Sequence, residues 1–292
     1  MERKEMPARF LAVTPPIKEL WWEGNRGLLA DTNKYLAIVG SRRMTDYGRR
    51  VLEMIMPDLV RAGLIIVSGM MYGVDQEAHK LCLKYGGKTI AVLGWGIEWP
   101  GLTREDRELQ EKIAKEGLVI SEWEKKKPEL WTFPARNRIV AGLADSVLVA
   151  EAALKSGSMV TVTWAQKFGK SVLAIPGPIT SKVSAGTNQL IAAGRAKMVL
   201  SAEDILCSYG LQRTPTQLVM FTGAERTNNF PHRILELLEN EPLTTDEMVR
   251  ILCDKVEKIN VVLTEMNLSE LIEERNGKWE LGVKMRQDAC PS

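Results

Sequence analysis

Cysteine and histidine are scarce in this sequence of 292 residues. It holds four cysteines, Cys82, Cys207, Cys253 and Cys290, and two histidines, His79 and His232. The cysteines lie far apart and form no C-x-x-C pair, which argues against a zinc site and against a disulfide framework. We therefore predict no metal, no other cofactor and a reducing, cytoplasmic environment.

Long apolar runs are also missing. No stretch of about 18 apolar residues is present, so we expect no membrane span and no membrane partner. The N-terminal MERKEMPARF lacks the apolar segment of a signal peptide. Hydrophobic residues nevertheless make up 45% of the chain, enough for one large core and a small second domain.

The net charge of +2 is unevenly spread along the chain. Residues 231–292 hold 8 basic and 13 acidic residues, which leaves 31 basic and 24 acidic residues in the first 230. A basic body with an acidic tail predicts that a polyanion would bind the body. Chance variation of the surface explains the same pattern equally well.

Short β-branched runs alternate with helical spacing through the middle of the chain. This alternation predicts an α/β fold, an extended Rossmann-like, doubly wound and mostly parallel sheet. The expected strands are 35–40, 64–69, 89–94, 118–121, 146–150 and 171–176, and expected helices include 47–62, 74–85, 104–116 and 157–168. We divide the chain into an N-terminal extension packing on the Rossmann domain (1–34), the Rossmann-like domain (35–207), a linker (208–229) and a winged-helix domain (230–285).

The C-terminal unit shows three helical segments and a hairpin. Thr244 or Thr245 can cap the second helix, and Asn276–Gly277 marks the hairpin turn. Residues 256–273 are expected to form the third helix. Its candidate core positions are Val261, Val262, Met266, Leu268 and Leu271.

Ligands of such sheets bind at the carboxyl ends of the strands, so the turns there carry the candidate site. In the first turn Gly40 allows a close approach of the backbone, Ser41 offers a hydroxyl, and Arg42 and Arg43 suit phosphate oxygens. An ordinary turn with two solvated arginines is an equally good interpretation. The turn is not G-x-G-x-x-G, so no dinucleotide fingerprint is present.

Asp75 and His79 follow the second turn. They could form an acid–base pair, but no nucleophile accompanies them, so we favour a helix cap and a packing histidine.

The third candidate element begins with Phe133, Arg136, Asn137 and Arg138. Basic groups beside an exposed aromatic ring suit single-stranded nucleic acid, since they supply phosphate contacts and a stacking surface. Phe133 could equally pack under the helix as a hydrophobic staple. Further along, Lys155, Ser156 and Gly157 form a second candidate phosphate cradle at a strand-to-helix turn.

Gly169-Lys170-Ser171 looks like the end of a P-loop but lacks its first glycine, because Trp164 occupies that position. Gly169 is better explained as the end of a helix. The last turn places Gly177, Gly186 and Asn188 at the strand ends, where backbone and small polar groups face a ligand.

Together these motifs resemble the DprA/Smf family of DNA-processing proteins. The matching pieces, in order over about residues 10–206, are AIVGSRR, IIVSGMMYGVDQEAH, AVLGWGIEWP, LVISE, FPARNRIVAGLADSVLVAEAALKSGSMVT, AIPGPITSKVSAGTNQLI and AEDIL. Met70, Met71 and Tyr72 depart from the smaller residues usual in the second piece, GWGIEWP departs from the usual pattern, and no helical SAM-like domain precedes the Rossmann part.

The resemblance implies a single-stranded DNA-binding protein, without chemistry of its own, that protects incoming DNA and helps load the RecA recombinase in natural transformation. It also implies a homodimer. By motif match, the resemblance implies DNA contacts at Arg42 or Arg43, Phe133, Arg136, Asn137, Arg138 and Lys155. The turns themselves add further candidate DNA-binding residues, which are Gly40, Ser41, Ser156, Gly157, Gly177, Gly186 and Asn188.

Two other functions compete with this one. A related Rossmann group of phosphoribohydrolases processes nucleotides with a catalytic glutamate, and Leu190 stands at that position here. Duplex reading by the winged helix is disfavoured because its third helix offers Lys258 among several glutamates. A partner-protein or dimer surface suits this acidic unit better.

Overall fold

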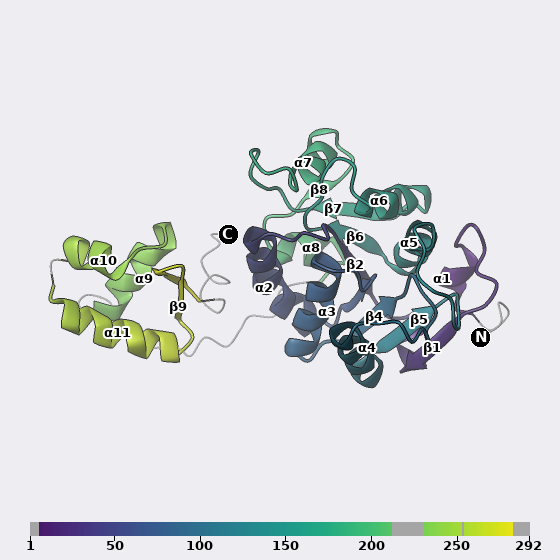
Figure 1. The fold of residues 1–292 in the computed structure, drawn as a ribbon. Coiled ribbons are helices and arrows are strands. Elements are labelled where there is room, and N and C mark those ends of the chain that lie inside the picture. Colours follow the sequence, from purple (N-terminus) through teal and green to yellow (C-terminus); the bar gives the residue numbers. More distant parts are fainter. Residues whose placement is uncertain (1–5, 212–229, 253, 283–292) are drawn as a thin grey trace. The chain divides into compact units, whose positions relative to one another are not determined.

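The computed structural model describes residues 6–211, 230–252 and 254–282, and the chain divides into two compact units, Met1–Thr214 and Pro215–Ser292 (Figure 1). The first unit is an eight-stranded sheet in the order β1-β5-β4-β3-β2-β6-β7-β8. Seven strands run parallel, and β1 is antiparallel to β5. The strands are β1 Trp21–Gly24, β2 Tyr35–Val39, β3 Ile65–Ser68, β4 Thr89–Val92, β5 Leu118–Ser121, β6 Ser146–Val149, β7 Ser171–Ala174 and β8 Lys197–Met198. The predicted Rossmann-like fold is confirmed, as are its six predicted strands.

The sheet is buried on both faces, which explains why its strands read as continuous apolar runs. Tyr35, Ala37 and Val39 of β2 point into one core cluster, and Leu36 and Ile38 point into the other. Helices α1 Ala8–Leu11, α5 Thr132–Leu143, α6 Ser158–Lys167 and α7 Ala185–Ala192 cover the first face. Helices α2 Asp46–Arg61, α3 Val74–Lys84, α4 Arg104–Glu116 and α8 Ala202–Ser208 cover the second (Figure 1).

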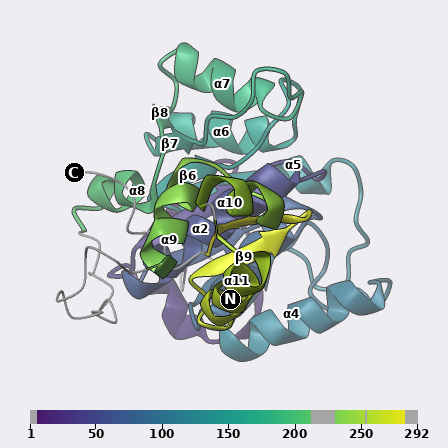
Figure 2. The ribbon, with the colours of Figure 1, turned by 90° about the vertical axis from the view of Figure 1, so that its left-hand side faces the viewer.

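Both views of the ribbon place α6 and α7 beside β7 and β8, at one end of the sheet (Figures 1 and 2). Gly169 follows α6 with φ +67°, the left-handed conformation of a helix terminator, so the interpretation of this glycine as a helix end is confirmed. No helix in the described part of the chain combines the length and the apolar composition that a bilayer crossing requires.

Two edge strands, β1 and β8, and three short helices, α1, η2 and α8, were not predicted. Strand β1 pairs with β5 through its Trp21-Trp22-Glu23-Gly24 run, and the 3₁₀ helix η2 Arg26–Leu29 follows it. Gly24 has φ +103°, and a Cβ there would collide with the carbonyl oxygens of Ala114 and Gly117. The sequence WWEG therefore ends its strand in a glycine that no other residue could replace without strain.

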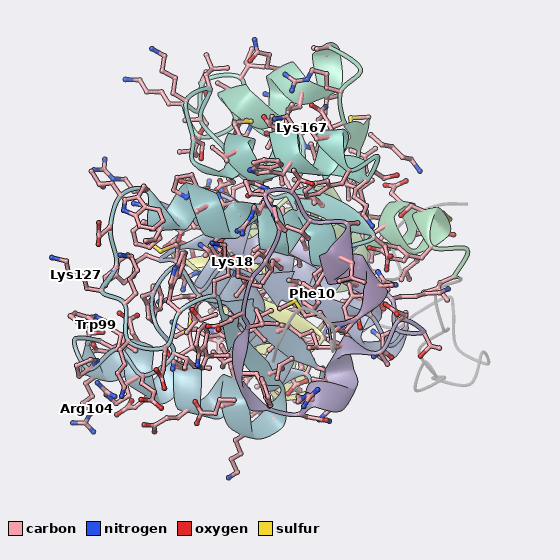
Figure 3. All side chains as sticks on the ribbon, turned by 90° about the vertical axis from the view of Figure 1, so that its right-hand side faces the viewer. Phe10, Lys18, Trp99, Arg104, Lys127 and Lys167 are labelled. Carbon is pink, nitrogen blue, oxygen red and sulfur yellow. The ribbon has the colours of Figure 1, made fainter. Side chains whose placement is uncertain are left out.

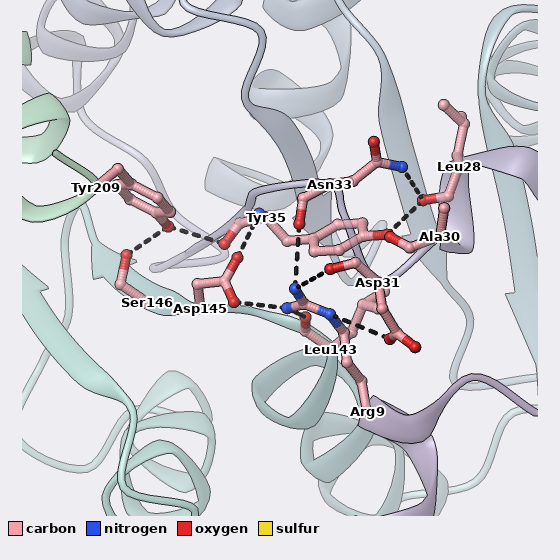
Figure 4. A network of polar contacts seen from close by, with 10 residues as sticks. All are labelled: Arg9, Leu28, Ala30, Asp31, Asn33, Tyr35, Leu143, Asp145, Ser146 and Tyr209. Atoms are coloured by element: carbon pink, nitrogen blue, oxygen red, sulfur yellow. Dashed lines mark hydrogen bonds and ion pairs between the residues drawn. The ribbon is translucent and has the colours of Figure 1, made fainter. Parts of the chain in front are cut away.

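A polar network ties the N-terminal extension to the amino ends of β2 and β6 (Figure 4). Arg9 of α1 donates to Asp145 at 2.6 Å and to backbone carbonyl oxygens of the 31–33 loop, and its guanidinium lies 4.6 Å from the centroid of the Tyr35 ring. Asp145 in turn accepts the Tyr35 N–H at 2.8 Å. The Tyr209 hydroxyl donates to the Tyr35 carbonyl at 2.8 Å and lies 2.6 Å from the Ser146 hydroxyl.

Within residues 230–252 and 254–282, the second unit contains three helices and a hairpin, the elements of a winged helix. They are α9 Phe230–Asn240, α10 Thr245–Leu252, α11 Val256–Leu268, β9 Ile272–Arg275 and β10 Lys278–Leu281. Thr244 caps α10 in reciprocal bonds with Glu247, and Asn276 and Gly277 both have positive φ in the hairpin turn.

The predicted third helix was too long and its core face was partly wrong. Helix α11 ends at Leu268, five residues before the predicted end, and Val261 and Leu268 are 58% and 81% exposed. The buried positions are Ile259, Leu263 and Met266, which follow the i, i+4, i+7 spacing of one helix face. Val261 and Leu268 fall off that face.

Candidate nucleic-acid interface

The carboxyl ends of the parallel strands gather the predicted turns at one edge of the sheet, as the topology requires. The turn after β2 is shaped by its two small residues. A Cβ at Gly40 would press on Val74 and on the Glu151 carbonyl oxygen. The buried Ser41 hydroxyl accepts the Arg43 N–H at 3.0 Å. Gly40 and Ser41 therefore set the path of the backbone.

The two arginines of this turn point to solvent. Arg42 and Arg43 are exposed, and neither forms an ion pair with another residue that the structure describes. The Arg42 guanidinium carbon lies 5.4 Å from the centroid of the Phe133 ring. Both cations are therefore free to meet an anion, and one of them already rests over an aromatic ring.

Phe133 is partly packed in the core and partly open at the edge of the sheet. The ring is half-buried, packs against the cluster that contains Trp95, and meets the Trp95 ring edge-on at 6.5 Å between centroids. Its contact with Arg42 shows that it also borders the edge where Arg42 stands. A ring anchored in this way is a pre-positioned surface on which a base could stack.

Arg136 does not occupy the exposed position that the sequence suggested. Its guanidinium is buried, donates to the Val92 carbonyl oxygen, and lies against Gly69, where a Cβ would collide with it. Burial lowers its pKa to about 10, with Asp75 opposing that change. We correct its role from phosphate contact to a buried cation beneath the edge.

Asp75 is the anionic counterpart of Arg136. Burial raises the pKa of Asp75 to about 6, against the opposing influence of Arg136 and of the backbone N–H groups of Met71, Gly69 and Gly40. Because these backbone groups come from two different turns, Asp75 holds the turns after β2 and β3 together.

His79 is a packing residue, as the sequence favoured. Its Nδ1 lies 2.6 Å from the Thr89 hydroxyl in the core, and burial lowers its pKa to about 3. A neutral, buried imidazole of this kind is not available to a substrate.

Arg138 is likewise removed from the candidate site. It makes two bonds to the Glu122 carboxylate, at 2.6 and 2.5 Å, and its Nε donates to the Pro15 carbonyl at 2.8 Å. Its Nη1 also donates to the Ala135 carbonyl at 2.7 Å. These contacts pin α5 to the chain after β5 and to the N-terminal extension, leaving Arg138 buried.

Asn137 joins α5 to the turn before α6. Its side-chain amide donates to the Gly157 carbonyl at 3.3 Å, and the Ser156 and Ser158 hydroxyls lie 2.7 Å apart in the same turn. Lys155 is exposed and forms no ion pair with any other described residue. This turn therefore presents one free cation from a braced backbone.

The last turn is braced by a side-chain clamp. Asn188 accepts the Gly177 N–H at 3.0 Å and donates to the Gly177 carbonyl at 2.9 Å. The Gly186 N–H donates to the Ala152 carbonyl at 2.7 Å, which joins this turn to the chain that leads from β6 to Lys155. Gly177, Gly186 and Asn188 thus have structural partners within the chain.

Glu151 is a residue that sequence reasoning missed. It is buried and accepts both the N–H and the hydroxyl of Thr45, the residue that caps α2. The sequence did offer a sign of this residue, because a glutamate that directly follows a buried strand needs a hydrogen-bonding partner. Across the described residues, no group of three or more His, Cys, Asp and Glu side chains could hold a metal ion.

Comparison with known proteins identifies relatives of the whole first unit. The family model of DNA recombination-mediator protein A matches residues 1–210. The DNA processing protein DprA of Streptococcus pneumoniae is 41% identical over 193 residues, which are 65% of this chain and 66% of that protein. DprA of Bacillus subtilis is 35% identical over 222 residues, 75% of this chain and 71% of that protein.

Two solved structures are similar to this chain in both fold and sequence. The X-ray structure of S. pneumoniae DprA is 38% identical, with a TM-score of 0.65 over 71% of this chain and 72% of the other. A Helicobacter pylori DprA structure, described for its single-stranded DNA binding mode, is 34% identical, with a TM-score of 0.64 over 70% of this chain and 93% of the other. The chain belongs to the DNA recombination-mediator protein A family, the DprA/Smf family.

Proposed function

We propose that this protein binds single-stranded DNA along the carboxyl edge of its sheet, as a recombination mediator without chemistry of its own. Arg42, Arg43 and Lys155 contact phosphates, and Phe133 stacks on a base. The observation that carries the proposal is the set of three exposed cations, each without an ion pair among the described residues, on turns at the carboxyl ends of the strands, with one of them, Arg42, over the half-buried Phe133 ring. Unpaired cations beside an aromatic surface are the general requirement of single-strand binding.

The relatives support the same ligand. The H. pylori structure is described as showing single-stranded DNA binding by DprA, and this chain covers 93% of it. We extend the proposal to protection of incoming DNA, loading of RecA and a homodimeric state, the roles that the resemblance to the DprA/Smf family implies. A nucleotide-processing role is disfavoured, because Leu190, at the position of the catalytic glutamate, is packed in the core.

The proposal is tested by the salt dependence of binding to single-stranded and duplex oligonucleotides. We expect the single strand to bind much more tightly at equal salt. Arg42→Ala should weaken binding to all sequences alike and make the slope of log affinity against log salt shallower by about 0.7, the contribution of one phosphate contact.

Arg138→Ala is the matched control, since the pair with Glu122 is internal. It should lower the melting temperature, while the salt slope of the remaining folded protein stays unchanged. Equal affinity for single strand and duplex, or an unchanged slope in a folded Arg42→Ala protein, would contradict the proposed site.

A further inference from the structure

A tryptophan and a leucine stand exposed immediately before Phe133. Trp131 is 51% exposed and Leu130 is 92% exposed, at the start of α5. Both lie in the 122–131 loop, which joins β5 to α5 and has no part in the DNA site described so far. Together these two neighbouring side chains place apolar surface beside the proposed binding edge, and grouped exposed apolar surface is typical of interaction sites.

The Trp131 ring is held in one orientation. It meets the Trp123 ring edge-on, with centroids 5.9 Å apart and planes at 88°. Its Nε1 donates to the Glu129 carboxylate at 2.8 Å, and Glu129 also pairs with Lys126 at 3.0 Å. The Lys126 ammonium lies 4.9 Å from the Trp131 ring centroid.

The loop itself is fixed by backbone pairing with the segment after β4. Gly96 donates to the Lys126 carbonyl at 2.7 Å, and Ile97 donates to the Trp123 carbonyl at 2.9 Å. The side-chain view places Lys127 and Trp99 toward the same margin of the unit (Figure 3). Little ordering of the loop is therefore needed before a ligand can bind, which lowers the entropic cost of association.

The order of the strands places this loop in line with the first site. Arg42 follows β2 and Trp123 follows β5, with β3 and β4 between them. Three strand spacings amount to about 14 Å, the length of about four stacked nucleotides. Phe133 lies between the two ends, packed on Trp95 after β4.

The loop also offers a cation. Lys127 is exposed and forms no ion pair within the described ranges, whereas Lys125 lies 3.6 Å from Glu98 and Lys126 pairs with Glu129. The exposed Trp131 ring and the exposed Lys127 ammonium group thus form the same kind of pair, an aromatic ring with a cation, as Phe133 and Arg42.

We propose that Trp131, braced by Trp123, is a second base-stacking position for single-stranded DNA, with Lys127 contacting a phosphate beside it. The inference rests on the proposed function. It extends the path of the bound DNA from the turn after β2 to the loop after β5. It predicts that long oligonucleotides use this position and that very short ones, bound at Arg42 and Phe133, do not.

The test measures the affinity of the full chain for oligo-dT of about two and about twenty nucleotides by fluorescence anisotropy, because two nucleotides are too short to span the roughly 14 Å from the Arg42 turn to the loop. Trp131→Ala should weaken the long oligonucleotide about fivefold or more, the lower end of one base–aromatic stack, and change the short one less than about twofold. Trp131→Phe should keep most of the affinity. Leu130→Ala, which removes exposed apolar surface from the same loop but no ring, should change neither.

A second readout does not depend on the alanine variant folding well. Adding the long oligonucleotide should quench more tryptophan fluorescence in the natural protein than in Trp131→Phe. Equal quenching, or a Trp131→Ala protein that binds both lengths as the natural one does while Arg42→Ala weakens both, would overturn the inference and leave the ring as a protein contact. Equal weakening of both lengths would overturn it too, because Trp131 would then act through Phe133. Failure of the natural protein to bind single strands would instead refute the proposed function.

Discussion

Asp75 and Arg136 show how a buried pair supports a binding edge without touching the ligand. Between them they contact the ends of β2, β3 and β4, the strands whose turns carry Arg42 and the Phe133 surroundings. A carboxyl whose pKa is about 6, well above its ordinary 3.8, makes this support sensitive to pH.

We predict a pH-dependent contribution of Asp75 to the free energy of unfolding. Its folded pKa is raised, so the native state holds the proton more tightly, and this contribution is present below about pH 4 and lost as the pH rises through about 6. The loss amounts to about 3 kcal/mol. Denaturant unfolding of the natural protein and of Asp75→Asn, measured from about pH 4 to 7, should show their stability difference falling by that order.

His79 contributes a slope of the opposite sign, because its folded pKa of about 3 is lowered and its contribution appears as the pH rises. It is common to both proteins and cancels in their difference. A difference that stays flat across this range would show that Asp75 is ionised throughout.

At the scale of elements, the N-terminal extension depends on one arginine. Arg9→Ala would leave Asp145 without its cation and three backbone carbonyl oxygens without a donor. We expect a loss of about 2 kcal/mol in the free energy of unfolding, measured by denaturant titration, because charged hydrogen bonds in a partly buried site are broken.

Arg104→Ala is the control for this prediction. Arg104 also pairs with a carboxylate, Glu108 at 2.7 Å, but both side chains are largely exposed, so the change should stay below about 0.5 kcal/mol. Equal effects of the two substitutions would show that the Arg9 network adds nothing to the docking of α1.

The elements that the sequence predicted well are those buried on both faces. Strands such as 35–40 and 146–150 are apolar without interruption, so their signal survives without knowledge of the fold. The edge strands β1 and β8 carry no such signal, since Trp21-Trp22-Glu23-Gly24 and Lys197-Met198 are strands only because a neighbour pairs with them.

The candidate site was predictable as a set of turns but not as a set of exposed side chains. Arg42, Arg136 and Arg138 look alike in sequence. In the structure, however, Arg136 donates to the Val92 carbonyl oxygen and Arg138 pairs with the Glu122 carboxylate. Their partners come from distant parts of the chain. Only the tertiary structure separates an arginine that supports the edge from one that faces solvent.

At the scale of the molecule, the two units differ in charge. Residues 231–292 carry 13 acidic against 8 basic residues, so at low salt this segment should repel phosphates rather than attract them. We predict that a chain ending at Thr214, the boundary of the first unit, keeps single-strand affinity within about threefold of the full chain.

Anisotropy titrations of the two chains at equal salt check this, with melting curves to show that the shorter chain is folded. A folded first unit that no longer binds would place the second unit in the DNA site. Tighter binding by the shorter chain would instead mean that the acidic unit competes with DNA.

The polar network around Arg9 fastens α1 to the amino ends of β2 and β6, at the opposite end of these strands from the turn that carries Arg42. An anchor attached at α1 would therefore hold the protein on a surface with its basic edge directed away from the support. Such an immobilised layer would suit single-molecule or sensor measurements, in which a passing strand must reach the protein unobstructed.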